Sequence, residues 1–131
     1  MPKILIVEDE ISLLKILTDQ FTIEKFDVLN AKDGKEGLES ALQNHPDIIL
    51  LDINMPVMNG LDMLQALRQD VWGKDAPVVV LSSSQDSESI SAGLNHKVLK
   101  YYIKSDWKIE DLIKEVKEML DRVQQSPDDK K

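Results

Sequence analysis

The chain has 131 residues and a formal net charge of −8, so it is long enough to bury the core of one domain. Its acidic excess argues against non-specific nucleic-acid binding, which depends on clustered Lys and Arg. The sequence has no cysteine, which excludes disulfides, thiolate metal sites and thiol nucleophiles. Met1-Pro2-Lys3 leads straight into a strand-like run, and no apolar stretch approaches a membrane span. We therefore expect a cytoplasmic protein without a signal peptide.

In chain order, the sequence predicts strands that alternate with helices. The first, third and fourth apolar runs are continuous, which is typical of parallel strands that are covered on both faces. Between the runs, apolar residues recur at the three- and four-residue spacing of a helix face. The predicted elements are a strand at Lys3–Val7, a helix around 14–21, a strand at Asp27–Ala31, a helix from Asp33-Gly34 to just before Pro46, a strand at Asp47–Leu51, a helix around 61–71, a strand at Pro77–Leu81, a weakly apolar helix around 87–94, a strand at Val98–Ile103 and a strongly amphipathic helix over 109–123.

This alternation predicts a doubly wound α/β fold, with right-handed crossovers between parallel strands. Residues 1–123 form the predicted single domain. Residues 124–131 are polar, contain Pro127 and lack periodicity, so we expect a disordered tail there.

Acidic residues directly follow two of the predicted strands. Glu8, Asp9 and Glu10 come after the first strand, and Asp52 comes after the third. In open α/β folds the carboxyl edge of the sheet is where sites are built. A cluster of like charges there needs a cation, and oxygen ligands suit a hard ion such as Mg²⁺. Taken alone, the first three acids could simply decorate a helix N-terminus.

Four sequence motifs in the same order carry a family resemblance. They are residues 4–10 (Ile-Leu-Ile-Val-Glu-Asp-Glu), 50–60 (Leu-Leu-Asp-Ile-Asn-Met-Pro-Val-Met-Asn-Gly), 77–82 (Pro-Val-Val-Val-Leu-Ser) and 101–104 (Tyr-Tyr-Ile-Lys). Over about residues 3–123 the chain resembles the receiver domain of two-component response regulators. The resemblance implies a flavodoxin-like fold with five helices and a five-stranded parallel sheet in the order 2-1-3-4-5.

The resemblance also implies roles for the acidic residues. Asp52 would be the phosphoacceptor, and Mg²⁺ would be the cofactor. Asp9, Asp52 and the backbone carbonyl of Asn54 would bind the ion directly, and Glu8 would act through a metal-bound water. Phosphoryl transfer depends mainly on positioning and on neutralising oxygen charge, which agrees with this set.

Residues after the fourth and fifth strands would complete the site. Lys104 would supply a positive group, and the Ser82 hydroxyl would donate a hydrogen bond to the phosphoryl group. Ser82 and Tyr101 would also act as the switch, since the resemblance implies that the aromatic side chain turns inward when the hydroxyl moves. The surface formed by the fourth helix, fifth strand and fifth helix would then change.

The resemblance further implies the partners. A sensor histidine kinase or phosphotransfer protein would be the donor, and an unidentified protein would receive the output. We expect no direct nucleic-acid or membrane binding, and a monomer that could dimerise on phosphorylation. The chain would phosphorylate and dephosphorylate itself without being an enzyme for other substrates.

Two other functions stay open at this point. A haloacid-dehalogenase-type phosphatase also forms an aspartyl phosphate, but it needs an acid two residues after the nucleophile, where this chain has Asn54. A phosphorylation-independent adaptor or engineered scaffold is the second alternative. It is suggested by Ser105 in place of the family's usual Pro and by Lys97-Val98 in place of Gly-Ala.

Overall fold

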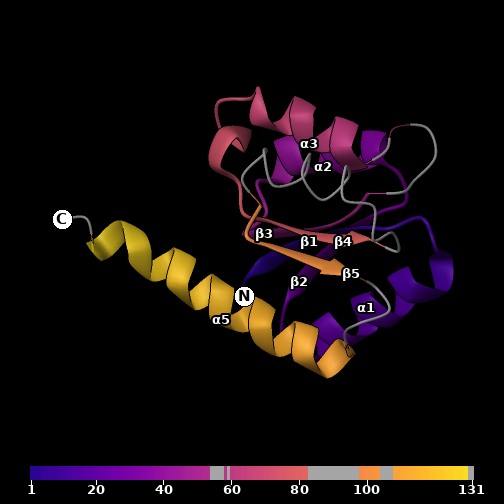
Figure 1. Ribbon diagram of the computed structural model, residues 1–131. Coiled ribbons are helices and arrows are strands. Elements are labelled where there is room, and N and C mark those ends of the chain that lie inside the picture. The colour runs from indigo at the N-terminus through magenta and orange to yellow at the C-terminus, as the bar shows by residue number, and fades with distance from the viewer. Residues whose placement is uncertain (54–57, 59, 83–97, 104–107, 130–131) are drawn as a thin grey trace.

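The computed structural model describes residues 1–53, 58, 60–82, 98–103 and 108–129. Strands and helices alternate over these residues (Figure 1). The predicted helix around 87–94 lies outside the described residues. The elements are β1 (Lys3–Val7), α1 (Ile11–Ile23), β2 (Asp27–Ala31), α2 (Gly34–Asn44), β3 (Ile48–Asp52), α3 (Gly60–Arg68), the 3-10 helix η1 (Gly73–Asp75), β4 (Val78–Ser82), β5 (Lys100–Ile103) and α5 (Ile109–Asp129).

The five strands form one parallel sheet in the order β2-β1-β3-β4-β5, which confirms the predicted topology. Val7 of β1 is in register with Leu51 of β3, and Leu51 with Val80 of β4. Both β3 and β4 end one residue later than predicted, so Asp52 and Ser82 are the last residues of their strands. The carboxyl ends of the strands therefore meet at one edge.

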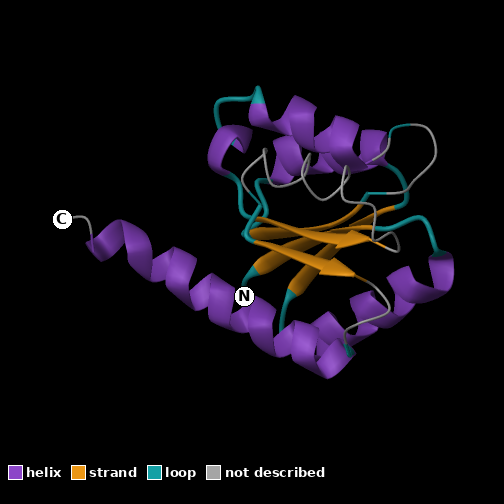
Figure 2. Cartoon of the chain, viewed as in Figure 1, coloured by secondary structure: helices purple, strands orange, loops and turns teal. Residues whose placement is uncertain are grey.

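Helices cover both faces of the sheet, and each face has its own core (Figure 2). On one face, which we call the α1–α5 core, Leu50 packs with Phe21 of α1 and Val116 of α5 in one buried cluster. On the other face, the α2–α3 core, Leu51 belongs to a cluster that includes Leu64 of α3. Neighbouring strand residues thus enter different cores, because side chains alternate along a strand. This explains the continuous apolar runs.

The boundaries of α2 confirm the sequence prediction. The Asp33 carboxylate accepts a hydrogen bond from the backbone N–H of Glu36 at 2.9 Å, which is an N-cap. At the other end, α2 stops at Asn44 and His45 takes a left-handed conformation with φ of 48°. This end comes just before Pro46, which cannot continue a helix with a normal hydrogen bond.

The third helix is shorter than predicted. It ends at Arg68, and Val71, which we placed on its apolar face, is 95% exposed. The carboxylate of Asp70 accepts hydrogen bonds from the backbone N–H groups of Trp72 and Gly73, both at 2.9 Å. This side chain folds the backbone into a turn, which competes with helix continuation.

Helix α5 is longer than predicted. Its buried residues include Leu112, Val116 and Leu120, as the amphipathic pattern indicated. We expected a disordered tail from residue 124, but the helix continues to Asp129. Gln124 and Gln125 are good helix formers, and extending an existing helix is easier than starting one. Pro127 lies within this extension and costs one backbone hydrogen bond, but it does not end the helix. Within the described part of the chain, no helix has the length and apolar character needed to cross a membrane.

Candidate functional site

Three carboxylates come together at the carboxyl edge of the sheet. Glu8 and Asp9 follow β1, Asp52 ends β3, and one oxygen from each lies within 4.8 Å of the others. Glu8 is fully buried and Asp52 is 2% exposed, whereas Asp9 is half-buried. Glu10, the fourth acid of the sequence cluster, is exposed and occupies the N-cap position of α1. The predicted cluster is therefore confirmed for three of its four members.

The path of the chain after β1 holds Glu8 in place. Its backbone N–H donates to the carbonyl of Ala31 at 3.0 Å, which extends the pairing of β1 with β2 by one residue. Its Oε2 accepts a hydrogen bond from the backbone N–H of Glu10 at 3.0 Å. The carboxylate is thus fixed at the point where the strand turns into α1.

Two glycines let the backbone close tightly behind Asp52. The N–H of Gly60 donates to the carbonyl of Ile53 at 2.8 Å, and a Cβ at position 60 would lie 2.3 Å from the carbonyl oxygen of Asp52. The N–H of Gly34 donates to the carbonyl of Met58 at 3.0 Å, where a Cβ would lie 2.2 Å away. Any other residue would displace these segments.

The composition of the cluster fits a hard divalent cation. Negative charges at this separation repel one another, and burial strengthens the repulsion. Carboxylate oxygens are the ligands that Mg²⁺ accepts, usually one or two together with water. Glu8, Asp9 and Asp52 are therefore the described residues that could hold the ion.

The structure places the remaining predicted site residues only in part. Ser82 ends β4 in register with Ile103, one position beyond Leu81, which pairs with Asp52. Tyr101 lies on β5 in register with Val80. Asn54, Lys104 and the Lys104-Ser105 peptide lie outside the described residues. The backbone thus brings Ser82 to the same edge as Asp52, as predicted.

Comparison with known proteins identifies the family. The sequence matches the model of the response regulator receiver domain over residues 4–117. The chain belongs to the response regulator receiver family. Receiver domains of solved structure share its fold: chemotaxis protein CheY4 of Vibrio cholerae has a TM-score of 0.82 and 29% identity, covering 90% of this chain and 98% of that one. A CheY-like receiver domain from Methanospirillum hungatei has a TM-score of 0.89 at 24% identity, covering 96% of this chain and 98% of that one, and shows the fold alone.

Curated relatives of this receiver are longer proteins. Response regulator ArlR of Staphylococcus saprophyticus is 38% identical over 122 residues, which is 93% of this chain and 54% of the relative. Transcriptional regulatory protein PrrA of Mycobacterium tuberculosis is 38% identical over 121 residues, which is 92% of this chain and 51% of the relative. The chain thus spans about half the length of these relatives.

A second group of polar residues links β5 to α5 in this receiver domain, and sequence reasoning missed it. The Tyr102 hydroxyl donates a hydrogen bond to Oε1 of Glu115. Lys100 Nζ lies 3.5 Å from the same oxygen and 5.6 Å from the centre of the Tyr102 ring. The one signal in the sequence is that a tyrosine facing a core needs a partner for its hydroxyl.

This contact shifts the pKa values of both partners. Burial raises the pKa of Tyr102 well above its ordinary value, and the hydrogen bond and charge of Glu115 act in the same direction. The hydrogen bond from Tyr102 lowers the pKa of Glu115, which desolvation opposes and Lys100 reinforces. Both shifts favour the neutral hydroxyl beside the ionised carboxylate.

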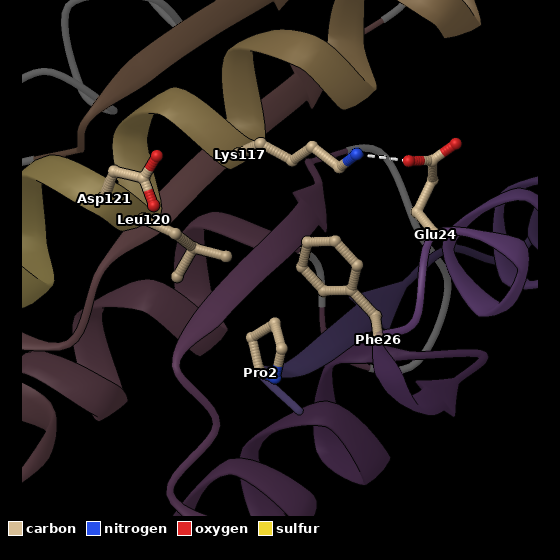
Figure 3. Close-up of a pocket in the computed structure, with 6 residues that line it drawn as sticks. All are labelled: Pro2, Glu24, Phe26, Lys117, Leu120 and Asp121. Atoms are coloured by element: carbon tan, nitrogen blue, oxygen red, sulfur yellow. Dashed lines mark hydrogen bonds and ion pairs between the residues drawn. The ribbon is translucent and has the colours of Figure 1, made fainter.

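An open pocket of about 330 Å³ lies at the opposite, amino edge of the sheet in the receiver (Figure 3). Its wall combines apolar and charged side chains, and Lys117 of α5 forms an ion pair with Glu24 at the end of α1. None of the predicted site residues that the structure describes lines it. The lining residues are Pro2, Glu24, Phe26, Lys117, Leu120 and Asp121.

Proposed function

We propose that this receiver accepts a phosphoryl group on Asp52 from a phosphohistidine of a sensor histidine kinase or phosphotransfer protein. One observation carries the proposal: Asp52 is buried beside Glu8 and Asp9 at the carboxyl edge of a receiver sheet. The family membership supports the same assignment.

The chemistry requires little beyond positioning. A carboxylate oxygen of Asp52 attacks phosphorus as the bond to the donor nitrogen breaks, and that nitrogen keeps the bonding electrons. Because the other nitrogen of the donor ring carries a proton, the histidine leaves as neutral imidazole. No separate base is needed, because an aspartate is ordinarily ionised at neutral pH. Later attack of water on phosphorus releases phosphate and restores the carboxylate.

Mg²⁺, when bound, would supply positive charge that neutralises the phosphoryl oxygens during transfer. Asp9 and Asp52 would bind it directly together with the backbone carbonyl of Asn54. Glu8, which is held by the N–H of Glu10, would orient a water on the ion. Positive charge that is already in place before the reaction lowers the barrier to phosphoryl transfer, because the surrounding groups need not rearrange during the step.

The response would begin at the neighbouring strands. The Ser82 hydroxyl would donate to the phosphoryl group and Lys104 would pair with its charge, while Tyr101 would turn inward. The altered surface, formed by the predicted fourth helix together with β5 and α5, would bind a protein partner in the cytoplasm, and the phosphorylated form could dimerise. We propose no turnover of other substrates, because the chemistry is confined to the chain's own carboxylate.

Phosphorylation with acetyl phosphate and Mg²⁺ tests the proposal. Intact-mass measurement should show one added phosphoryl group in the wild type and none in Asp52→Asn. The matched control is Glu39→Gln, which removes an exposed carboxylate on α2 and should be phosphorylated like the wild type. Equal phosphorylation of Asp52→Asn, or none of the wild type, would show that Asp52 is not the acceptor.

A further inference from the structure

The strand register links Asp52 to Tyr102 across the sheet. Asp52 of β3 pairs with Leu81 of β4, and Leu81 pairs with Tyr102 of β5. With a spacing of about 4.8 Å between neighbouring strands, the two ends of this row are about 10 Å apart. Residues paired in parallel strands point to the same face, and both Leu81 and Tyr102 belong to the α1–α5 core. The row therefore runs along the face that α5 covers.

The row continues into α5 through a polar contact. Tyr102 is only 8% exposed, so its ring packs inside the core while its hydroxyl reaches Glu115. Its ring shares the α1–α5 core with Leu112 and Val116 of α5. Apolar contacts like these are not directional, whereas a hydrogen bond fixes the position of one element along another.

We propose that Tyr102 is a positioning residue that couples α5 to the state of Asp52 through its hydrogen bond to Glu115. This inference rests on the proposed function, because it assumes that Asp52 changes charge and ligation. A close-packed row transmits a displacement at one end rather than absorbing it. A shift of β5 would then reach α5 through the bonded hydroxyl.

Three substitutions separate the hydrogen bond from charge and packing. Tyr102→Phe keeps the buried ring and removes only the hydroxyl. Glu115→Gln keeps an oxygen that can accept from Tyr102 but removes the negative charge. Lys100→Met removes the ammonium group near Glu115 and leaves the Tyr102–Glu115 bond in place. If this hydrogen bond couples α5 to Asp52, only Tyr102→Phe among these three substitutions should weaken the response of α5.

The response of α5 can be measured by amide NMR shifts on addition of Mg²⁺ and beryllofluoride, a phosphoryl mimic. In the wild type, amides over 109–122 should shift on saturation. In Tyr102→Phe these shifts should fall by roughly twofold or more, while the affinity at Asp52 stays within about threefold. Glu115→Gln and Lys100→Met should respond like the wild type.

The outcomes distinguish this inference from the proposed function. Saturable binding with wild-type α5 shifts in Tyr102→Phe would overturn the inference and leave the function of Asp52 standing. A loss of response in Lys100→Met as large as in Tyr102→Phe would also overturn it, because charge rather than the hydroxyl would be the link. No binding by the wild type would overturn both. Glu115→Ala is a second variant that removes the hydrogen bond, because alanine has no side-chain oxygen to accept from Tyr102. The Glu115 side chain is 38% exposed, so its truncation should leave the fold intact, and the variant should behave like Tyr102→Phe.

Discussion

At the scale of single residues, repulsion within the acidic cluster opposes folding when no cation is bound. Two unit charges 4.8 Å apart repel by about 3.5 kcal/mol at an effective dielectric constant of roughly 20. Glu8 and Asp52 are both buried, so water screens them poorly. We therefore expect the charge of Asp52 to lower the stability of the cation-free fold.

Replacing Asp52 should therefore stabilise the cation-free protein. We expect Asp52→Asn to raise the free energy of unfolding by about 1–3 kcal/mol in a chelating buffer, because one repelling charge is removed. Urea unfolding measures this directly. Glu39→Gln, which removes an exposed charge of the same sign, should change stability by less than about 0.5 kcal/mol. A less stable Asp52→Asn would show that the carboxylate is net stabilising where it lies.

Gly60 sets the backbone behind the same carboxylate. We expect Gly60→Ala to lower the free energy of unfolding by about 1–3 kcal/mol, because its Cβ would press on the Asp52 carbonyl oxygen. The displaced Asp52 should also bind Mg²⁺ more weakly, as titration calorimetry would report. Gln65→Ala, at an exposed position of the same helix, is the control and should leave both quantities nearly unchanged.

At the scale of elements, the contact between β5 and α5 predicts a pH dependence. The pKa of Tyr102 is raised in the folded state, so the unfolded chain loses this proton first as the pH rises. The stabilisation from the hydroxyl is therefore complete below the unfolded pKa of about 10 and is lost above it.

Urea unfolding of the wild type and Tyr102→Phe between pH 7 and 11 would test this pH dependence. The wild type should be more stable by about 1 kcal/mol near neutral pH, and the difference should shrink above about pH 10. Taking the difference between the two proteins cancels the titration of other groups. A difference that stays constant to pH 11 would mean that the folded and unfolded states ionise this hydroxyl alike.

Element boundaries are where sequence reasoning and structure differ most. The periodic pattern extended the third helix to Val71, but the carboxylate of Asp70 bonds two backbone N–H groups and turns the chain. At the end of α5, polarity and Pro127 suggested disorder, yet the helix runs on to Asp129. A side-chain hydrogen bond ends α3, and helix propagation extends α5. The spacing of apolar residues does not indicate either effect.

At the scale of the whole molecule, the sheet and the acidic cluster were predictable for one reason. Continuous apolar runs mark buried parallel strands, and parallel strands bring the residues at their ends to one edge, so Glu8 and Asp52 had to meet. The link from Tyr102 to Glu115 was not predictable, because thirteen positions and a strand-to-helix crossing separate the two. Such a pair depends on how α5 lies on the sheet, which no local pattern specifies.

Cation binding should stabilise the whole domain through the same cluster. At a Mg²⁺ concentration about one hundred times the dissociation constant, the free energy of unfolding should rise by about 2.7 kcal/mol. The chain has a net charge of −8, so general screening must be separated from binding. NaCl of equal ionic strength is the control for the wild type. In Asp9→Asn, Mg²⁺ should raise the free energy of unfolding little more than NaCl does. If Mg²⁺ stabilised this variant as much as the wild type, the ion would bind elsewhere.

The two cores separated by the sheet have a consequence for how the domain tolerates change. Leu50 and Leu51 are adjacent in sequence, yet each is enclosed by a different pair of helices. The sheet thus works as a partition, and repacking under α2 and α3 leaves the opposite compartment, with Leu81 and Tyr102, largely untouched. Apart from Gly34 and Gly60, residues of the α2–α3 core should therefore accept substitution with little effect on the proposed coupling of Asp52 to α5.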